Sequence, residues 1–183
     1  MRVLCFIILI FLASCGGEAR REKELLPPGK VRLKVDDAMI SKGDLEGIVL
    51  PMTWWIAIHG SDKDYAYEMH RFSKSQKLLY AVVTYLDDTK KEGHYAYFKL
   101  AAPDAVNDAM EGLNLMGLEE HAAILKRAAE KKANTRSEDL DLDDEDVAML
   151  ELNERVDARA LLVSFVRAHK QEFLYEQVVD KPR

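Results

Sequence analysis

Apolar residues recur at helical spacing through most of this chain, and residues 94–130 carry the pattern most clearly. Two amphipathic stripes lie on either side of Gly117, and the first follows Pro103, a residue that suits the first position of a helix. Gly117 suits the left-handed position that closes a helix, because glycine has no Cβ to clash there. Such a short connection predicts an antiparallel helical hairpin. The predicted buried positions are Ala105, Val106, Ala109, Met110, Leu113 and Met116 in the first helix and Leu118, Ala122, Ile124, Leu125, Ala128 and Ala129 in the second.

Helical spacing continues on both sides of this hairpin. Ser73 and Gln76 match a capping box, which predicts a helix that begins after Ser73. Its predicted buried face consists of Leu78, Leu79, Val82, Val83 and Leu86. Three more helices are predicted, from Leu45 to Ile58, from about Asp143 to Val156 and from about Ala158 to Tyr175.

One short segment near the start of the domain has a different period. Residues 31–35 alternate apolar and basic side chains, which indicates either a short strand or an extended segment lying on the domain. No alternating segment of useful length follows residue 40, so a strand here has no evident partner. The patterns together predict an all-α fold for residues 31–178, with a tail at 179–183. The expected architecture is a single-domain bundle of about six to seven helices with a central helical hairpin.

The N-terminus carries a different kind of signal. Met1-Arg2 precedes the apolar run Val3 to Leu12, which is short for a membrane span and typical of a secretory signal peptide. The run ends in Leu12-Ala13-Ser14-Cys15, which resembles the lipobox of bacterial lipoproteins. In that class the signal, here residues 1–14, is removed and the cysteine, here Cys15, is acylated. The alternatives are an ordinary signal peptide or an uncleaved anchor with a chance cysteine.

The residues around Cys15 fit lipid anchoring. Cys5 lies inside the signal, so cleavage leaves Cys15 as the only thiol, without a disulfide partner. Residues 15–30 are rich in glycine, charge and proline, which predicts a flexible tether to the domain. In the lipoproteins of some bacteria, the absence of aspartate directly after the acylated cysteine favours the outer membrane. By this resemblance, Gly16 slightly favours the outer over the inner membrane. We therefore expect a membrane-anchored lipoprotein of the cell envelope.

Acidic residues are concentrated in residues 138–146. A calcium-binding EF-hand loop requires glycine at its sixth position and glutamate at its twelfth. A loop that begins at Asp139 or at Asp141 has aspartate at the sixth position and leucine at the twelfth. The acids are therefore interpreted as an exposed loop that leads into a helix N-terminus, where the helix dipole favours negative charge. Weak divalent-cation binding is the alternative. The same acids form the candidate partner-binding surface: Glu138, Asp139, Asp141, Asp143, Asp144, Glu145 and Asp146.

Residues for catalysis or for holding a cofactor are not evident. The five histidines form no metal-binding pair, and no phosphate-binding loop or nucleophile motif occurs, so we expect no enzyme activity, cofactor or metal. His121 and His169 are expected at the surface. Glu92, His94, Tyr95 and Tyr97 either line a pocket or, as favoured here, belong to the core. The formal net charge of −6 disfavours direct nucleic-acid binding.

Two longer segments resemble a known family. They are the run from QKLLYAVVTYLDD to EEHAAILKRA and the downstream run LNERVDARALLVSFVRAHKQEF. They resemble the DMP-type DNA-mimic proteins in their helix-turn pattern, including Gly93, the pair Tyr97-Phe98 and Gly117. The resemblance implies an all-helical domain that forms a homodimer in the characterised branch. In those members, carboxylates are arranged like DNA phosphates, and the protein occupies the DNA-binding face of a transcription factor.

The sequence thus supports a main hypothesis and two others. The main one is a lipid-anchored, non-catalytic helical module that binds an unidentified protein partner in the cell envelope. The alternative is a DNA-mimic inhibitor of a DNA-binding protein, which requires that residues 1–15 are not an export signal. The third is a hydrolase-like activity at an unrecognised site, for which the sequence supplies no residues.

Overall fold

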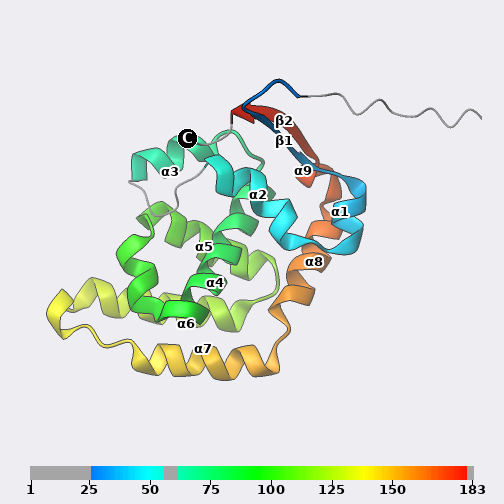
Figure 1. The fold of residues 1–183 in the computed structure, drawn as a ribbon. Helices are drawn as coiled ribbons and strands as arrows, with labels where there is room; N and C mark the ends of the chain where they lie inside the picture. Colours follow the sequence, from blue (N-terminus) through cyan, green and yellow to red (C-terminus); the bar gives the residue numbers. More distant parts are fainter. Residues whose placement is uncertain (1–25, 56–61, 181–183) are drawn as a thin grey trace, which may run out of the picture.

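The long helix α4 (Lys74–Leu100) lies at the centre of the domain and contacts α2, α5, α7 and α9 (Figure 1). The computed structural model describes residues 26–55 and 62–180. Within them, the helices before α4 are α1 (Asp37–Lys42), α2 (Leu45–Trp55) and α3 (Asp62–Met69). Those after it are α5 (Pro103–Leu115), α6 (Glu119–Asn134), the 3₁₀ turn η1 (Ser137–Asp139), α7 (Asp143–Arg155), α8 (Ala158–Ala168) and α9 (Lys170–Phe173). The predicted all-α fold is confirmed, with more short helices than expected.

The start of α4 is fixed by the predicted capping box. The Ser73 hydroxyl accepts a hydrogen bond from the Gln76 backbone N–H at 3.1 Å, and the Gln76 side chain accepts one from the Ser73 N–H at 2.9 Å. Two backbone donors that helix geometry leaves unpaired are thereby satisfied. From this start the helix buries Leu78, Leu79 and Val82 completely, whereas Val83 and Leu86 remain partly exposed.

The predicted hairpin is present as α5 and α6. Gly117 has φ +77°, and the Leu118 backbone N–H donates to the Leu113 carbonyl at 2.8 Å, which closes α5 with a Schellman-type turn. Of the predicted buried positions, only Met110 and Ala129 keep partial exposure. The hairpin packs against α4 at a close approach. A Cβ on Gly112 would lie 2.7 Å from Val82 Cγ2, so only glycine fits between the two helices there.

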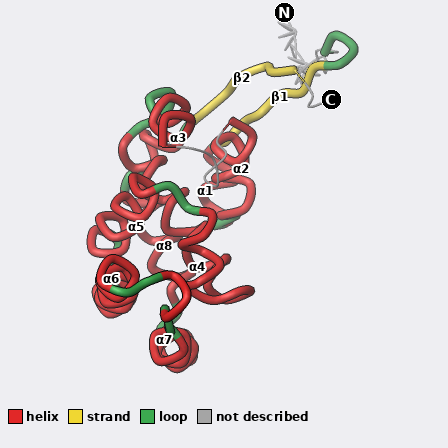
Figure 2. The backbone as a smooth tube through the Cα atoms, turned by 90° about the vertical axis from the view of Figure 1, so that its left-hand side faces the viewer, coloured by secondary structure: helices red, strands yellow, loops and turns green. Residues whose placement is uncertain are grey.

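The predicted last helix, from about Ala158 to Tyr175, is present as α8 and α9 with a break at His169, and only its last two residues are not helical. The chain then forms a strand, β2 (Tyr175–Asp180), which pairs antiparallel with β1 (Lys30–Val35). Residues 31–35 are therefore a strand, and their partner comes from the other end of the domain. The strand β2 also extends past the predicted domain end at residue 178. Figure 2 shows this two-stranded ribbon projecting from the helical body.

Several sequence predictions lie outside the described residues. They concern the signal segment 1–14, Cys15 and most of the tether, the end of the helix predicted to reach Ile58, His59, and residues 181–183 of the tail. In the part of the chain that is described, no helix has both the length and the apolar character needed to cross a bilayer.

Candidate functional site

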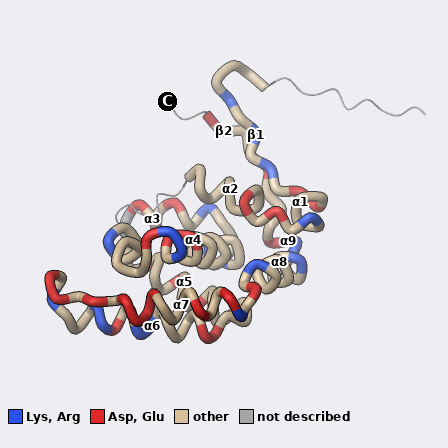
Figure 3. The backbone as a smooth tube through the Cα atoms, turned by 60° about the horizontal axis from the view of Figure 1, so that its bottom comes forward, with Lys and Arg blue, Asp and Glu red and all other residues tan. Residues whose placement is uncertain are grey.

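The acidic segment runs from η1 into the first turn of α7. Five of its acids are exposed: Glu138, Asp139, Asp141, Asp143 and Asp144. We refer to these five residues as the acidic surface, and Figure 3 shows the concentration of acidic positions along this part of the chain. The helix begins at Asp143, as predicted, so its first-turn carboxylates face the positive end of the helix dipole. The Asp141 carboxylate accepts a hydrogen bond from the Asp143 N–H at 2.9 Å, which orders the approach to the helix.

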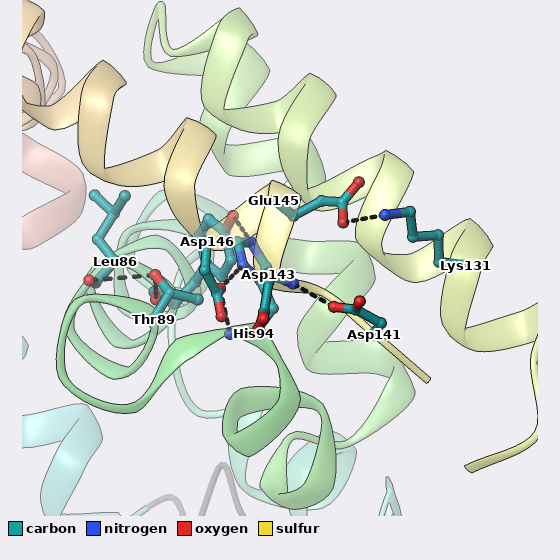
Figure 4. A network of polar contacts seen from close by, with 9 residues as sticks. Leu86, Thr89, His94, Lys131, Asp141, Asp143, Glu145 and Asp146 are labelled. Carbon is teal, nitrogen blue, oxygen red and sulfur yellow. Dashed lines mark hydrogen bonds and ion pairs between the residues drawn. The ribbon is translucent and has the colours of Figure 1, made fainter. Parts of the chain in front are cut away.

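Asp146 lies behind the acidic surface and points into the domain. Its Oδ1 atom accepts two hydrogen bonds from one residue, from the His94 backbone N–H at 2.9 Å and from the His94 Nδ1 position at 2.5 Å (Figure 4). On the other side of the imidazole ring, Nε2 lies 2.9 Å from the Tyr85 hydroxyl. The carboxylate fixes the proton on Nδ1, so Nε2 accepts from the Tyr85 O–H.

Two members of the Tyr85–His94–Asp146 triad are closed to solvent, whereas the Asp146 side chain is 33% exposed. Tyr85 and His94 are fully buried, and burial raises the pKa of the Tyr85 hydroxyl well above its ordinary value. The residue types would suit acid-base chemistry, but the Tyr85 hydroxyl and the His94 ring are buried out of reach of water and substrate. The triad instead fastens the start of α7 to the middle of α4.

Gly93 makes room for this attachment. It interrupts α4 with φ +79° and ψ 174°, a backbone conformation that only glycine adopts readily. A Cβ at this position would lie 2.5 Å from Asp146 Oδ2. The break in α4 therefore aims the His94 N–H at Asp146 and leaves space for the carboxylate.

Glu145 provides a second attachment. Its side chain is 5% exposed, and its Oε2 atom lies 2.7 Å from Lys131 Nζ on α6. The hydrogen bond with Glu145 raises the pKa of the Lys131 ammonium group. Two of the seven acids predicted to contact a partner, Glu145 and Asp146, therefore hold α7 in place from inside. Sequence spacing could not separate them from the five that remain exposed.

Beside the acidic surface, α7 exposes two large apolar side chains. Val147 is 54% exposed and Leu150 is 57% exposed. They share one side of the helix with Asp143, Glu151 and Glu154, because residues three or four apart on a helix are neighbours. We call Asp143, Asp144, Val147, Leu150, Glu151 and Glu154 the outer face of α7. Sequence analysis missed its apolar pair, although the i, i+3 spacing opposite Met149 and Leu152 would have revealed it.

The histidines and aromatic residues fall into different environments. His94 and Tyr97 are buried, which confirms the interpretation as core, whereas Tyr95 is exposed. The expectation that His121 lies at the surface is wrong. It is buried against Asn153 at 3.2 Å, and this burial lowers its pKa. In the described ranges, no three histidine, cysteine, aspartate or glutamate residues are grouped to hold a metal ion.

Comparison with known protein families gives a match over more than half of the chain. A family model described as DMP19-like protein matches residues 70–169, from just before α4 to the end of α8. This range contains the hairpin, the Tyr85–His94–Asp146 triad and the outer face of α7. No curated protein and no solved structure matches the chain.

Proposed function

We propose the following function for the chain, which belongs to the DMP19-like protein family. It is a non-catalytic helical module that binds a protein partner through the acidic surface and the outer face of α7. Lipid attached at Cys15 holds the module on a membrane of the cell envelope, with the outer membrane slightly favoured. The membrane and the partner are thus its two attachments.

The observation that carries this proposal is the combination of exposed Val147 and Leu150 with surrounding carboxylates on one helix. Protein interfaces draw much of their affinity from a few apolar side chains that become desolvated at the centre of the contact. Charged side chains around them speed encounter and exclude partners of like charge. Asp146 and Glu145 hold the helix that carries this surface, so little order has to be gained on binding.

A crosslinking experiment in cells tests the proposal. A photoreactive amino acid replaces Val147 or Leu150 in the full chain, and the matched control replaces Leu115, which is 55% exposed at the end of α5. We expect a specific protein adduct from positions 147 and 150 and little or none from position 115. Adding Asp143→Lys and Asp144→Lys should lower the yield, because a complementary partner is then repelled. Equal yields from all three positions would contradict the proposal.

A second candidate function is a DNA-mimic inhibitor of a DNA-binding protein. Family membership and the series of exposed acids in residues 138–144 favour it. It requires that residues 1–15 do not act as an export signal, so that the chain stays in the cytoplasm. Fractionation separates the two candidates, and so does the identity of the crosslinked protein. A DNA-binding protein captured at position 147 would favour the inhibitor, and an envelope protein would favour the anchored module.

A further inference from the structure

A groove of about 780 Å³ lies between α2 and α4 on one side and the connection from α7 to α8 on the other. Its volume falls in the range of ordinary ligand sites. Apolar side chains of three helices line the groove, including Val49 of α2, Leu86 of α4 and Leu162 of α8. Leu50 stands at its edge and is 47% exposed. An occupant must therefore present apolar groups to the floor.

The rim of the groove carries charged side chains. Arg159 donates two hydrogen bonds to the Glu46 carboxylate, at 2.7 and 2.9 Å, and this pair joins α8 to α2. Asp87 of α4 and Glu154 of α7 line the same groove, and neither has an ion-pair partner within the described residues. Lys90 is the remaining rim cation without such a partner in the same described ranges. Asp157 at the start of α8 also lines the groove and has no ion-pair partner among the described residues. The rim charge outside ion pairs is thus three carboxylates against one ammonium group.

The groove is continuous with the outer face of α7. Glu154 belongs to both, and it lies four residues, about one helical turn, beyond Leu150. A partner that covers Val147 and Leu150 therefore reaches the groove by following α7 toward its C-terminus. The acids along this route, Asp143, Asp144, Glu151 and Glu154, extend the negative character of the rim.

We infer that the groove receives a cationic amphipathic segment of the partner protein, with aliphatic side chains on the floor and basic side chains against Asp87 and Glu154. This inference rests on the proposed partner-binding function and names the chemistry of the partner. A purely apolar occupant would remove the two carboxylates from water without a compensating charge. An anionic segment would be repelled by them. A helix with an apolar stripe and a basic side satisfies both requirements of the groove.

A binding experiment with synthetic peptides tests the inference. The full-length protein is held in nanodiscs of zwitterionic lipid, and a fluorescent helical peptide of leucine and lysine is titrated against it, with empty nanodiscs as the blank. Two control peptides are a scrambled leucine–lysine sequence without an apolar stripe and a leucine–glutamate helix. We expect saturable binding of the amphipathic cationic peptide and at least about tenfold weaker binding of both controls, equivalent to about 1.4 kcal/mol.

Matched variants locate the site. Leu50→Lys should weaken binding of the cationic peptide by about tenfold or more, because it removes an apolar contact and places a like charge at the edge of the groove. Leu115→Lys should leave binding unchanged, because Leu115 is similarly exposed and does not line the groove. Asp87→Lys with Glu154→Lys should also weaken binding, whereas Glu130→Lys on α6 should not. Leu50 and Leu115 are 47% and 55% exposed, so we expect a charge at either position to cost little folding stability.

Three outcomes would overturn the inference: equal binding of the control peptides, binding unchanged by Leu50→Lys, or conversion of a dimer into a monomer by Leu50→Lys. The last would identify a second copy of the chain as the occupant. These outcomes are distinct from failure of the proposed function. Crosslinks at Val147 with no groove binding would refute the inference alone, and groove binding with no such crosslinks would refute the outer face of α7 as the partner surface.

Discussion

At the scale of single residues, the position of the acidic surface depends on what lies behind it. Gly93 adopts a conformation open only to glycine, and this places the His94 N–H and imidazole against one carboxylate oxygen of Asp146. Tyr85 closes the far side of the ring. The carboxylate of Asp146 is thus held by His94 inside the domain, whereas the carboxylates of Asp143 and Asp144 are exposed and can contact a partner.

We expect Gly93→Ala to lower the free energy of unfolding by more than about 1–3 kcal/mol, because it adds a steric clash with Asp146 Oδ2 to the backbone strain. Gly117→Ala is the matched control. Gly117 also has positive φ, but a methyl group added there would meet no atom within 4 Å. Gly117→Ala should lower the free energy of unfolding by only about 1 kcal/mol, because it adds backbone strain without a steric clash. Urea denaturation of both variants measures the difference, and equal costs would mean that the contact with Asp146 does not matter.

His121 predicts a pH dependence of stability. Burial lowers its pKa in the folded state, so the unfolded chain takes up a proton more readily. The stability contributed by neutral His121 is therefore present above pH about 6.5, the unfolded pKa, and is lost as the pH falls toward the lowered folded pKa. We expect His121→Gln to show a smaller fall in melting temperature between pH 7.5 and 5.5 than the unsubstituted protein.

The control for this titration is His70→Gln, because His70 is exposed on the same chain. This variant should keep the full fall in melting temperature. If His121→Gln behaved in the same way as His70→Gln, the acid sensitivity would have to come from other groups.

At the scale of elements, helices with a local cause could be predicted and pairing between distant segments could not. The capping box of α4, the glycine between α5 and α6, and the acidic start of α7 each act within a few residues, and each prediction is confirmed. The strand β2 depends on β1, which lies at the opposite end of the domain, so its sequence alone did not distinguish it from a continuing helix.

The same distinction applies to the candidate site. The acids were evident as a cluster, but whether each carboxylate faces water, α4 or α6 is decided by helix packing. Lys131 on α6 forms an ion pair with Glu145 on α7. His94, which comes from a segment far earlier in the chain, binds Asp146. The groove is likewise assembled from α2, α4 and α8, so no single segment carries its signature.

The contact between α6 and α7 predicts unequal effects of two lysines on one helix. Lys131→Met leaves the buried Glu145 carboxylate without its cation, and we expect a loss of about 1–3 kcal/mol in the free energy of unfolding. Lys126→Met removes an exposed lysine whose carboxylate lies 3.9 Å away, and it should change stability by less than about 0.5 kcal/mol. Thermal or urea unfolding of the two variants, measured side by side, distinguishes a structural attachment from a surface pair. Similar values for both would contradict the role given to Glu145.

At the scale of the whole molecule, the proposed function divides the chain into an anchor and a recognition domain. The anchor depends on a single side chain, Cys15, and the domain carries the acidic surface and the groove. Two or more acyl chains are needed for stable attachment, since each buried methylene contributes only about 0.8 kcal/mol. Membrane attachment and partner binding are therefore expected to be separable by substitution.

We expect Cys15→Ala to abolish fatty-acid labelling and to move the protein out of the membrane fraction of cells. Cys5→Ala is the matched control, because Cys5 lies within the predicted signal and is not the acylated residue. It should leave labelling intact. Labelling that survives Cys15→Ala would remove the lipid anchor from the proposal, while leaving the partner-binding surface to be judged by crosslinking.

The pairing of β1 with β2 has a consequence for the order of events during biosynthesis. The first strand leaves the ribosome before any helix of the domain exists, and its partner is made only after all of them. A lone strand has no stability of its own, so β1 can form its hydrogen bonds only after the helices and β2 have been synthesised. For the proposed lipoprotein, which would pass through a translocation channel before it matures, such late closure is suitable, because the domain cannot finish folding while β2 is still unmade.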